Sequence, residues 1–341
     1  MAKQEIERNS FGDSLKYLLM IFVVYGHMIE THVENSPFNQ AMYNYIYIFH
    51  MPLFVFISGR FSHIRNSQRY LLRLLTIFET YIVFQFLRCS KSLWEGGHLS
   101  LFPDLLIPKG ILWYLACLII WRIMIYILKD LKDYLMERRK WFFLFISFVT
   151  GLGIGFIMVP NGAITRFFSL GPFFLMGYYL NVSRIESLFQ RIPLLTTITL
   201  MISLWLLIYI YLNFDIRSVI YFESFYDNLP TSPFYYLGAR IFLYAFAIII
   251  GFALMSIVYS KPLLSSYGNY TLAIFMYHTI IIKTINPLFV NEIIPSNEIL
   301  LFVISIAICF SLAWLTKKYK IMTIMLNPAT YIMKKYIYNK K

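Results

Sequence analysis

The sequence is short of charged residues. Only 14% of its 341 residues are Asp, Glu, Lys or Arg, whereas soluble proteins carry about 25%. Acidic residues are the scarcer kind, 17 against 30 basic ones, and 59% of the chain is hydrophobic. This composition excludes a water-soluble globule and predicts that most side chains are surrounded by lipid or by one another.

Cysteine is also scarce, and several common motifs are missing. The three cysteines, Cys89, Cys117 and Cys309, lie far apart, which excludes a disulfide framework and a cysteine metal site. Neither a Gly-rich phosphate loop nor a Gly-x-Ser-x-Gly elbow occurs. The first apolar run lacks the small-residue cleavage site of a signal peptide, so we expect it to remain in the mature chain as a transmembrane helix.

Long apolar runs are what the sequence has in abundance. About 20 apolar residues in a helix cross the hydrocarbon of a bilayer, and somewhat fewer can suffice. The candidate spans are 14–30, 42–58, 70–87, 111–128, 141–159, 167–182, 194–213, 235–258, 270–285 and 299–316. They predict an all-α, polytopic integral membrane protein with about ten transmembrane helices. We expect residues 1–315 to form this transmembrane domain and residues 316–341 to form a basic cytoplasmic tail that lies on the membrane.

The basic residues predict the topology. Most of them gather in alternate connections and in the C-terminal tail, for example Arg60, Arg65, Arg69 and Arg73 after the second span. Because cytoplasmic loops are rich in Lys and Arg, both termini are expected to lie in the cytoplasm. The expected location of the protein is a bacterial plasma membrane. The net charge of +13 then reflects these loops and attraction to anionic lipid, and nucleic acid is not an expected partner.

Two polar residues interrupt the first span. Lys16 and His27 are 11 residues apart, which is about 16 Å along a helix and close to three turns, so both lie on one face. Lys16 alone is also typical of a cation that anchors a helix at the membrane surface. An ionisable group inside a span is a functional hypothesis by default, and the plainer reading of His27 is a neutral histidine bonded to a neighbouring helix.

Two further histidines lie in the middle of predicted spans. His50 precedes Pro52 in the second span, which runs antiparallel to the first, so His27 and His50 are expected to share a cavity. His278 lies in the ninth span, where a structural hydrogen bond is an equal alternative. Two histidines with no carboxylate nearby are a weak metal signal, so no metal is expected. The remaining histidines, His32, His63 and His98, fall in loops and are expected to be solvated.

Histidine suits two kinds of chemistry at such a position. It is a general base near neutral pH, and its ring nitrogen can carry an acyl group covalently. The sequence favours base catalysis or acyl transfer through His27 and leaves the two routes open.

Four segments resemble a known family when they are taken together and in order. They are the pattern Asp13-x-x-Lys16-x10-His27, "FHMPLFVFISG" at 49–59, "ILWYLACLIIW" at 111–121 and "YTLAIFMYH" at 270–278. The chain resembles the acyltransferase 3 family from residue 8 to about residue 315, and within it the fucose 4-O-acetylase-like branch of polysaccharide O-acetyltransferases. The broad family has Arg where this chain has Lys16, which keeps the charge but loses bidentate phosphate binding.

The resemblance implies a ten-helix membrane enzyme that moves acetyl from cytosolic acetyl-CoA to a hydroxyl of a cell-surface or lipid-linked glycan. Acetyl-CoA is then a substrate, and no bound cofactor is expected. The expected catalytic residues are His27, His50 and Lys16, with His50 orienting the substrate, stabilising the oxyanion or tuning the proton affinity of His27. The residues expected to bind substrate are Asp13, Trp113, His278 and Arg60. Trp113, near the outer end of the fourth span, is expected to line the acceptor pocket. Arg60 is one of the cytosolic arginines that are expected to attract the phosphates of CoA.

Two other classes of protein fit the same sequence. A transporter or exporter of a glycan or lipid-linked precursor uses buried histidines as a proton relay, although no inverted repeat is visible. If the chain is instead a structural partner of a glycan-synthesis complex, the buried histidines are expected to be dispensable. The sequence leaves open the acceptor sugar, the oligomeric state, and whether the donor carries acetyl or a longer acyl group such as succinyl.

Overall fold

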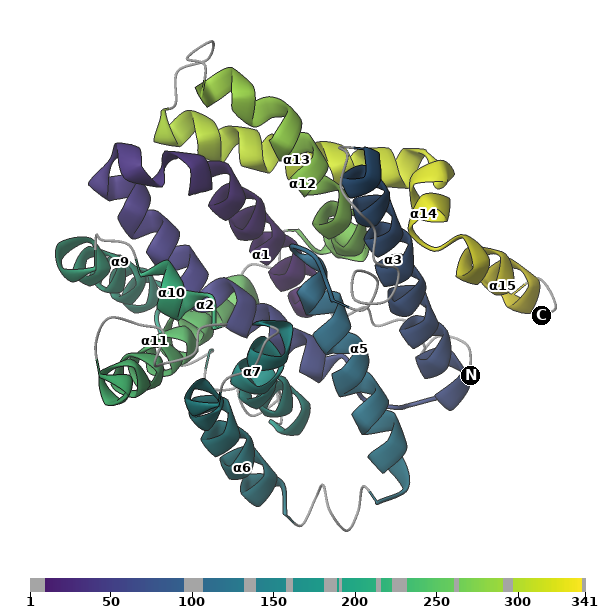
Figure 1. Cartoon of the computed structure of the whole chain (residues 1–341), viewed down its shortest axis with the longest axis horizontal. Coiled ribbons are helices and arrows are strands. Elements are labelled where there is room, and N and C mark those ends of the chain that lie inside the picture. Colours follow the sequence, from purple (N-terminus) through teal and green to yellow (C-terminus); the bar gives the residue numbers. More distant parts are fainter. Residues whose placement is uncertain are drawn as a thin grey trace. The chain divides into compact units, whose positions relative to one another are not determined.

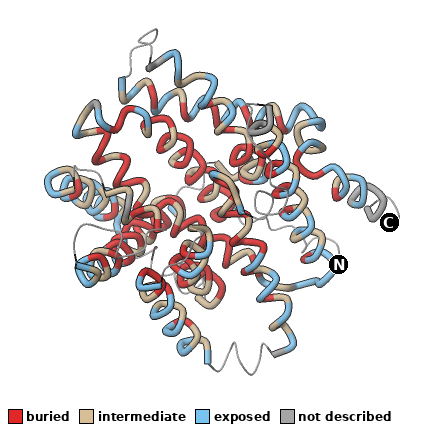
Figure 2. The backbone as a smooth tube through the Cα atoms, viewed as in Figure 1, coloured by how far each residue is buried: buried red, intermediate tan, exposed pale blue. Residues whose placement is uncertain are grey.

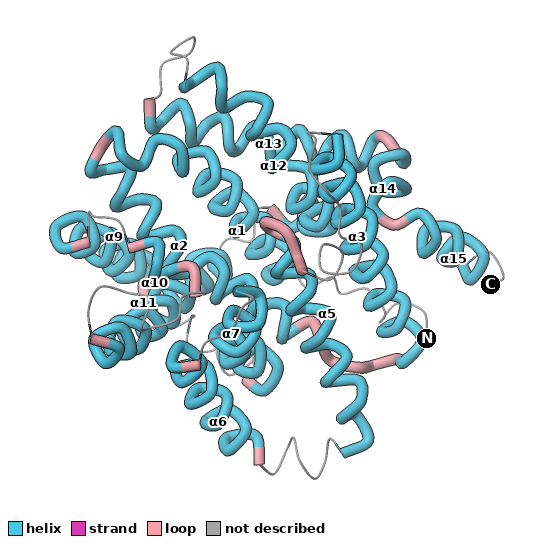
Figure 3. Tube along the Cα trace, viewed as in Figure 1, coloured by secondary structure: helices cyan, strands magenta, loops and turns pink. Residues whose placement is uncertain are grey.

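The chain is helical throughout the part that the structure, a computed structural model, describes. The described residues are 10–94, 107–131, 139–157, 162–180, 189, 192–212, 216–222, 232–260, 264–290 and 297–338. No strand occurs within these ranges (Figure 3). The all-α prediction is therefore confirmed for them, while the last residues of three predicted spans (158–159, 181–182 and 213), like His98, lie outside the described residues.

The helices follow the predicted spans closely (Figure 1). They are α1 (Ser10–Ile29), α2 (Pro37–Arg60), α3 (Ser67–Trp94), α5 (Leu112–Ile127), α6 (Lys140–Gly153), α7 (Gly162–Tyr179), α9 (Leu194–Tyr211), α10 (Arg217–Ile220), α11 (Pro233–Ser260), α12 (Thr271–Val290), α13 (Glu298–Lys318), α14 (Lys320–Leu326) and α15 (Pro328–Tyr338). Short 3₁₀ turns join some of them: η1 (Glu30–Asn35), η2 (Leu128–Leu131), η4 (Ile154–Phe156) and η6 (Ser265–Tyr270).

Six of the described helices are long and apolar enough to cross a membrane: α2, α3, α5, α9, α11 and α13. The predicted spans at α1, α7 and α12 also form helices but are not among these six, and α6 with η4 is a shorter apolar helix. Helices α1 and α12 carry Asp13, Lys16, His27 and His278 within otherwise apolar sequence. The count of about ten spans and the cytoplasmic termini remain predictions.

The chain divides into two compact units, each assembled from separate stretches of sequence. Unit 1 contains residues 1–57, 180–220 and 241–318, and unit 2 contains residues 58–179, 221–240 and 319–341. Helix α2 passes from one unit to the other at its C-terminal end, and α13 ends where unit 1 ends.

Helix α1 is the centre of unit 1. It packs against α12, α13 and η6, and most of its residues, including Asp13, are buried. Rings fasten it to its neighbours: Tyr25 lies 5.2 Å from Phe302 of α13, and Tyr17 lies 5.2 Å from Tyr267 of η6, between ring centroids. The polar residues of α1 are therefore held inside protein.

Burial separates the helices of unit 1 into two kinds. In α2, 83% of the apolar stretch is buried, compared with 11% in α9. Figure 2 shows the contrast as red along α1 and α2 and pale blue along much of α9. Because α9 exposes large apolar side chains such as Leu195 and Ile210, we assign this surface to lipid, whereas α1 and α2 face other helices.

Unit 2 is built on α3, α5, α6 and α7. The ring of Trp121 on α5 stacks on Phe167 and Phe174 of α7, at centroid distances of 5.5 and 5.1 Å. Gly59, the last residue of "FHMPLFVFISG", lies directly against the carbonyl of Phe174, so an added Cβ would meet that oxygen. Only glycine allows α2 and α7 to approach this closely.

The C-terminal helices belong to unit 2 and pack on α3. Both carboxylate oxygens of Glu79, on α3, accept backbone hydrogen bonds from the start of α15: Ala329 N donates to Oε1 at 2.5 Å and Thr330 N to Oε2 at 2.9 Å. A carboxylate at a helix N-terminus satisfies amides that have no partner within the helix. Glu79 therefore fixes where the tail begins on α3.

Candidate active site

His27 lies in the last turn of α1 and contacts the first residue of the next element. Its Nδ1 is 3.0 Å from Oε2 of Glu30, the first residue of η1. Residues three apart on a helix lie on the same face, so the end of α1 places the carboxylate beside the ring. Both side chains are half-buried, at 26% exposed for His27 and 38% for Glu30.

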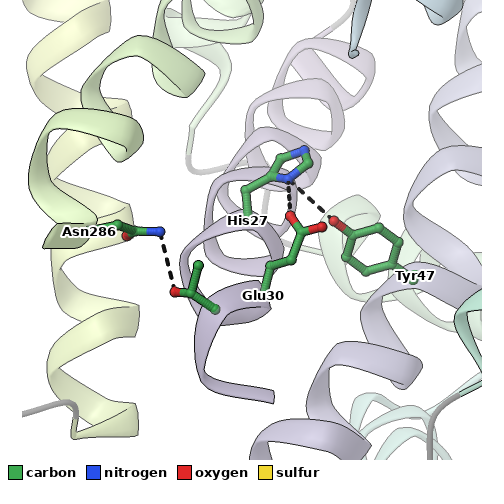
Figure 4. Close-up of polar contacts among 5 residues, drawn as sticks. His27, Glu30, Tyr47 and Asn286 are labelled. Atoms are coloured by element: carbon green, nitrogen blue, oxygen red, sulfur yellow. Dashed lines mark hydrogen bonds and ion pairs between the residues drawn. The ribbon is translucent and has the colours of Figure 1, made fainter. Parts of the chain in front are cut away.

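Tyr47 of α2 approaches the same nitrogen. Its hydroxyl is 3.3 Å from Nδ1 of His27, and Figure 4 shows the carboxylate of Glu30 and the hydroxyl of Tyr47 converging on one edge of the ring. An ionised carboxylate can only accept, so Nδ1–H donates to Glu30, and in the neutral ring Nε2 keeps its lone pair. Nε2 lies on the other side of the ring (Figure 4).

His50 is buried in α2, one turn beyond Tyr47. Its Nδ1 donates to the carbonyl of Ile46 at 2.8 Å, and its ring lies 4.7 Å from that of Tyr47 between centroids. Helix α2 continues through Pro52. Since a carbonyl can only accept, Nε2 of a neutral His50 is an acceptor facing away from its own helix turn.

His278 is held in the same way on α12. Its Nδ1 donates to the carbonyl of Ile274 at 3.0 Å, and its ring lies 5.4 Å from that of His27. Eight residues further along α12, Asn286 Nδ2 donates to the hydroxyl of Thr31 at 3.3 Å, which ties α12 to η1 (Figure 4). The three histidines predicted within spans therefore gather in unit 1, and we call His27, Glu30, Tyr47, His50 and His278 the histidine cluster.

Lys16 and Asp13 lie nearer the start of the same helix. Lys16 Nζ is 2.7 Å from Asp13 Oδ1, and Asp13 is the more deeply buried of the two. Gly268 of η6 packs so closely on Asp13 that a Cβ there would collide with it. Both residues lie on α1 with His27, as the sequence predicted, and the ion pair gives the half-buried Lys16 a fixed partner.

Two predicted substrate-binding residues belong to unit 2. Arg60 is half-buried at the end of α2. Trp113 is half-buried on α5, and the guanidinium of Arg166 from α7 lies over its ring at 4.8 Å. Arg166 also donates its Nε to the carbonyl of Tyr221 at 3.0 Å. The surroundings of Trp113 thus include a cation that the sequence analysis did not single out.

The structure corrects two expectations from the sequence. His32 is buried in η1, at 2% exposed, and not solvated, and burial lowers the pKa of its imidazole. The expectation that no carboxylate lies near the spanning histidines was also wrong, because Glu30 contacts His27 directly. By contrast, His63 is exposed, with its ring stacked 4.5 Å from Tyr178.

Glu30 and Tyr47 are the functional candidates that the sequence analysis missed. Both had a signal: Glu30 follows His27 by three residues, and Tyr47 precedes His50 by three, which is the spacing of neighbours on one helix face. No group of three His, Cys, Asp or Glu side chains in the described part of the chain is arranged to hold a metal ion.

A helical bundle of membrane-spanning length that holds a half-buried imidazole against a carboxylate has the features of an enzyme that uses a histidine as base or nucleophile. The chain matches the acyltransferase 3 family model, described as an acyltransferase domain, over residues 9–318, and it belongs to this family. It is therefore a membrane acyltransferase. No curated protein and no solved structure matches the chain. The resemblance to the family is confirmed, and the fucose 4-O-acetylase-like branch stays a prediction.

Proposed function

We propose that this acyltransferase moves an acetyl group from cytosolic acetyl-CoA to a hydroxyl of a cell-surface or lipid-linked polysaccharide, in the plasma membrane of a bacterium. The observation that carries the proposal is the contact of His27 Nδ1 with Glu30. It sets the tautomer that leaves Nε2 as a proton acceptor, which is what attack by a sugar hydroxyl needs.

In direct transfer, Nε2 of His27 takes the proton of the hydroxyl while the oxygen attacks the thioester carbonyl. The tetrahedral intermediate collapses as the C–S bond breaks, and the proton passes from His27 to the thiolate, giving the ester and CoA. Glu30 stabilises the imidazolium that forms between these two steps. In the alternative route, Nε2 attacks the thioester carbonyl and CoA leaves as the thiolate when the C–S bond breaks. The sugar hydroxyl then attacks the acetyl group on His27, its proton passes to the thiolate, and the C–N bond breaks to return the neutral ring.

The other members of the cluster have supporting roles in this proposal. Tyr47 holds its hydroxyl against the ring of His27 and its own ring against His50, so it links the two histidines. The Nδ1–H of His50 and that of His278 already donate to a carbonyl, so the Nε2 of each neutral ring is an acceptor that can hold and orient a hydroxyl of the substrate. Lys16, paired with Asp13, supplies a cation for the anionic donor.

Replacing His27 tests the proposal. For His27→Ala we expect the transfer of acetyl from acetyl-CoA to fall by about a hundredfold or more, with unchanged amounts of folded protein in the membrane. The measurements are acetyl-CoA consumption by purified protein in nanodiscs and acetyl esters on surface glycans by NMR, in cells carrying either variant and in a deletion strain.

His63→Ala is the matched control, since His63 is an exposed histidine outside the histidine cluster. Retained activity in His27→Ala removes His27 from the chemistry. Radiolabelled acetyl-CoA without acceptor separates the two routes: label that stays on the wild-type chain and is lost in His27→Ala identifies acetyl-histidine, and no label identifies direct transfer. Esters that are unaltered in the deletion strain contradict the proposed acceptor class.

A further inference from the structure

Tyr47 is the residue of α2 that meets α1 at His27. Its hydroxyl lies 3.3 Å from Nδ1 of His27, the nitrogen whose N–H donates to Glu30, so the oxygen of Tyr47 is a second acceptor on the same edge of the ring. The distance is long for a hydrogen bond, and a small further displacement would break the contact. The position of the Tyr47 ring therefore decides whether one or two groups fix the orientation of His27.

Tyr43 covers one face of the Tyr47 ring. The two residues are four apart on α2, and their rings stack with centroids 4.1 Å apart and an angle of 27° between the planes. Tyr43 is itself fully buried, at 0% exposed. Because a tyrosine side chain turns about only two bonds, a ring that is stacked on one face has few other positions to take.

The backbone of α1 lies against the same ring. A Cβ added at Gly26, the residue before His27, would come within 3.1 Å of Cε2 of Tyr47, which is tighter than ordinary packing. The ring of His50, 4.7 Å from that of Tyr47 and at 79° to it, lies on a further side. Tyr47 is therefore confined by Tyr43, by the backbone of α1 and by His50.

The turn of α2 that carries Tyr43 is itself fixed within unit 1. Asn44, the next residue, is fully buried, and its Nδ2 donates to the carbonyl of Leu212 at 2.6 Å. Its Oδ1 accepts a hydrogen bond from Nε2 of Gln40 at 3.0 Å. Buried amide side chains are stable in an apolar helix when their hydrogen bonds are made, so this turn gives Tyr43 a fixed place from which to support Tyr47.

Tyr45 provides the contrast on the same helix. It follows Tyr43 by two residues, which places it on the other side of α2. Its hydroxyl donates to the carbonyl of Met201 in α9 at 3.3 Å, and its ring lies 5.5 Å from that of Phe49. Tyr45 is also buried, at 6% exposed, but these contacts join α2 to α9 and involve no member of the histidine cluster.

We infer that Tyr43 is a positioning residue for the transfer reaction. It acts through Tyr47: the stacked ring holds the hydroxyl of Tyr47 at Nδ1 of His27, and this contact keeps the imidazole aligned while Nε2 takes the proton or attacks the thioester. Without the ring of Tyr43, Tyr47 turns into the vacated space and its hydroxyl leaves His27. The inference rests on the proposed function, since it assigns a role in the chemistry of His27.

The test compares two buried tyrosines of one helix. For Tyr43→Ala in nanodiscs we expect kcat for acetyl-CoA consumption to fall about tenfold, because small displacements of a reacting group are costly, and KM for acetyl-CoA to stay unchanged. Tyr45→Ala, the matched control, also removes a buried ring, so it should lower Tm to a similar extent and leave kcat unchanged. Tyr43→Phe keeps the stacked ring and should retain the kcat of the wild type.

A double variant separates a positioning role from a structural one. Tyr47→Phe removes the hydroxyl and keeps the ring, and we expect it alone to lower kcat by about the same factor as Tyr43→Ala. If Tyr43 acts through that hydroxyl, Tyr43→Ala causes no further loss in the Tyr47→Phe protein. If Tyr43→Ala yields no folded protein, Tyr43→Leu takes its place with the same expectations, because leucine fills much of the space and cannot stack.

Three results overturn the inference: equal losses of kcat in Tyr43→Ala and Tyr45→Ala, the full tenfold loss repeated in the Tyr47→Phe background, or a Tyr43→Phe protein as slow as Tyr43→Ala. Each of them leaves the proposed function standing. A wild-type protein that consumes no acetyl-CoA, or a His27→Ala protein as active as the wild type, contradicts the proposed function itself.

Discussion

Two polar centres of this protein, the histidine cluster of unit 1 and Arg122 in α5 of unit 2, are anchored in opposite ways. In unit 1, each histidine of the cluster is fixed within a few residues of its own position: His50 by the carbonyl of Ile46 and His278 by that of Ile274, each four residues earlier. In unit 2, Arg122 is fixed through Tyr70, which is 52 residues away in sequence. One centre is held by local contacts and the other by contacts between helices.

The two kinds of anchor predict different effects of mutation at the two centres. Local anchors form with the helix itself, so the ring orientation of the histidines survives small shifts of one helix against another. Anchors between helices exist only when the bundle packs correctly. We therefore expect changes in the histidine cluster to alter chemistry and leave folding intact, and changes in the packing of unit 2 to alter folding first.

The largest effect is expected where two helices of unit 2 touch through a backbone. Gly59→Ala places a methyl group against the carbonyl of Phe174, which costs about 3 kcal/mol or more because neither backbone can move away freely. The measurements are the yield of monodisperse protein and its Tm in detergent.

Gly153→Ala is the matched control, since a Cβ added to this helical glycine meets nothing within 4 Å. It should leave Tm unchanged or raise it slightly. A Gly59→Ala protein with the yield and Tm of the wild type would show that α2 and α7 do not approach as closely as the structure has them.

A large effect on chemistry, with none on folding, is expected at Glu30. Glu30→Gln removes the carboxylate that orients His27, and we expect kcat/KM to fall by about a hundredfold while Tm stays within about 2 °C of the wild type. Thioester turnover with acetyl-CoA and thermal unfolding are the two measurements.

Glu34→Gln provides the comparison within the same turn. Glu34 is 89% exposed and lies 3.8 Å from Arg217, so its loss should change neither quantity. Equal activity of the Glu30→Gln and Glu34→Gln proteins would remove Glu30 from the proposed chemistry, and a lower Tm in Glu30→Gln alone would mean that the histidine cluster also supports the fold.

The smallest effect is expected at Glu79, where a contact between helices holds only the tail. Glu79→Gln removes the charge at the start of α15 and keeps one acceptor oxygen, which should weaken the docking of α15 by about 1 kcal/mol. Hydrogen exchange is expected to quicken at the amides of Ala329 and Thr330 and to remain unchanged in α13. Unchanged exchange at both amides would show that Glu79 does not hold the tail.

The helices and the histidines at their centre were predictable, because each leaves a local signal. An apolar run of about 20 residues specifies a helix in lipid wherever it occurs, and an imidazole inside such a run stands out against it. Lys16, His27 and His278 stand out in this way in α1 and α12.

The partners of those residues were predictable only in part. Glu30 and Tyr47 lie three residues from His27 and His50 on their own helices, so helical spacing alone would have found them. The burial of His32 had no such signal, because it depends on which side chains pack on that side of η1. Nor did the contact of the Tyr70 hydroxyl with the carbonyl of Arg122, which depends on how α3 and α5 meet.

The sequence by itself determined an α-helical membrane protein, its family, and a first helix with Lys16 and His27 on one face, because hydropathy and helical period act over short distances along the chain. Only the tertiary structure decided that three histidines share one cluster and that Tyr70 of α3 bonds to the backbone of Arg122 in α5. Contacts between residues far apart in sequence depend on which helices pack together and at what depth, and neither follows from the composition of any single helix.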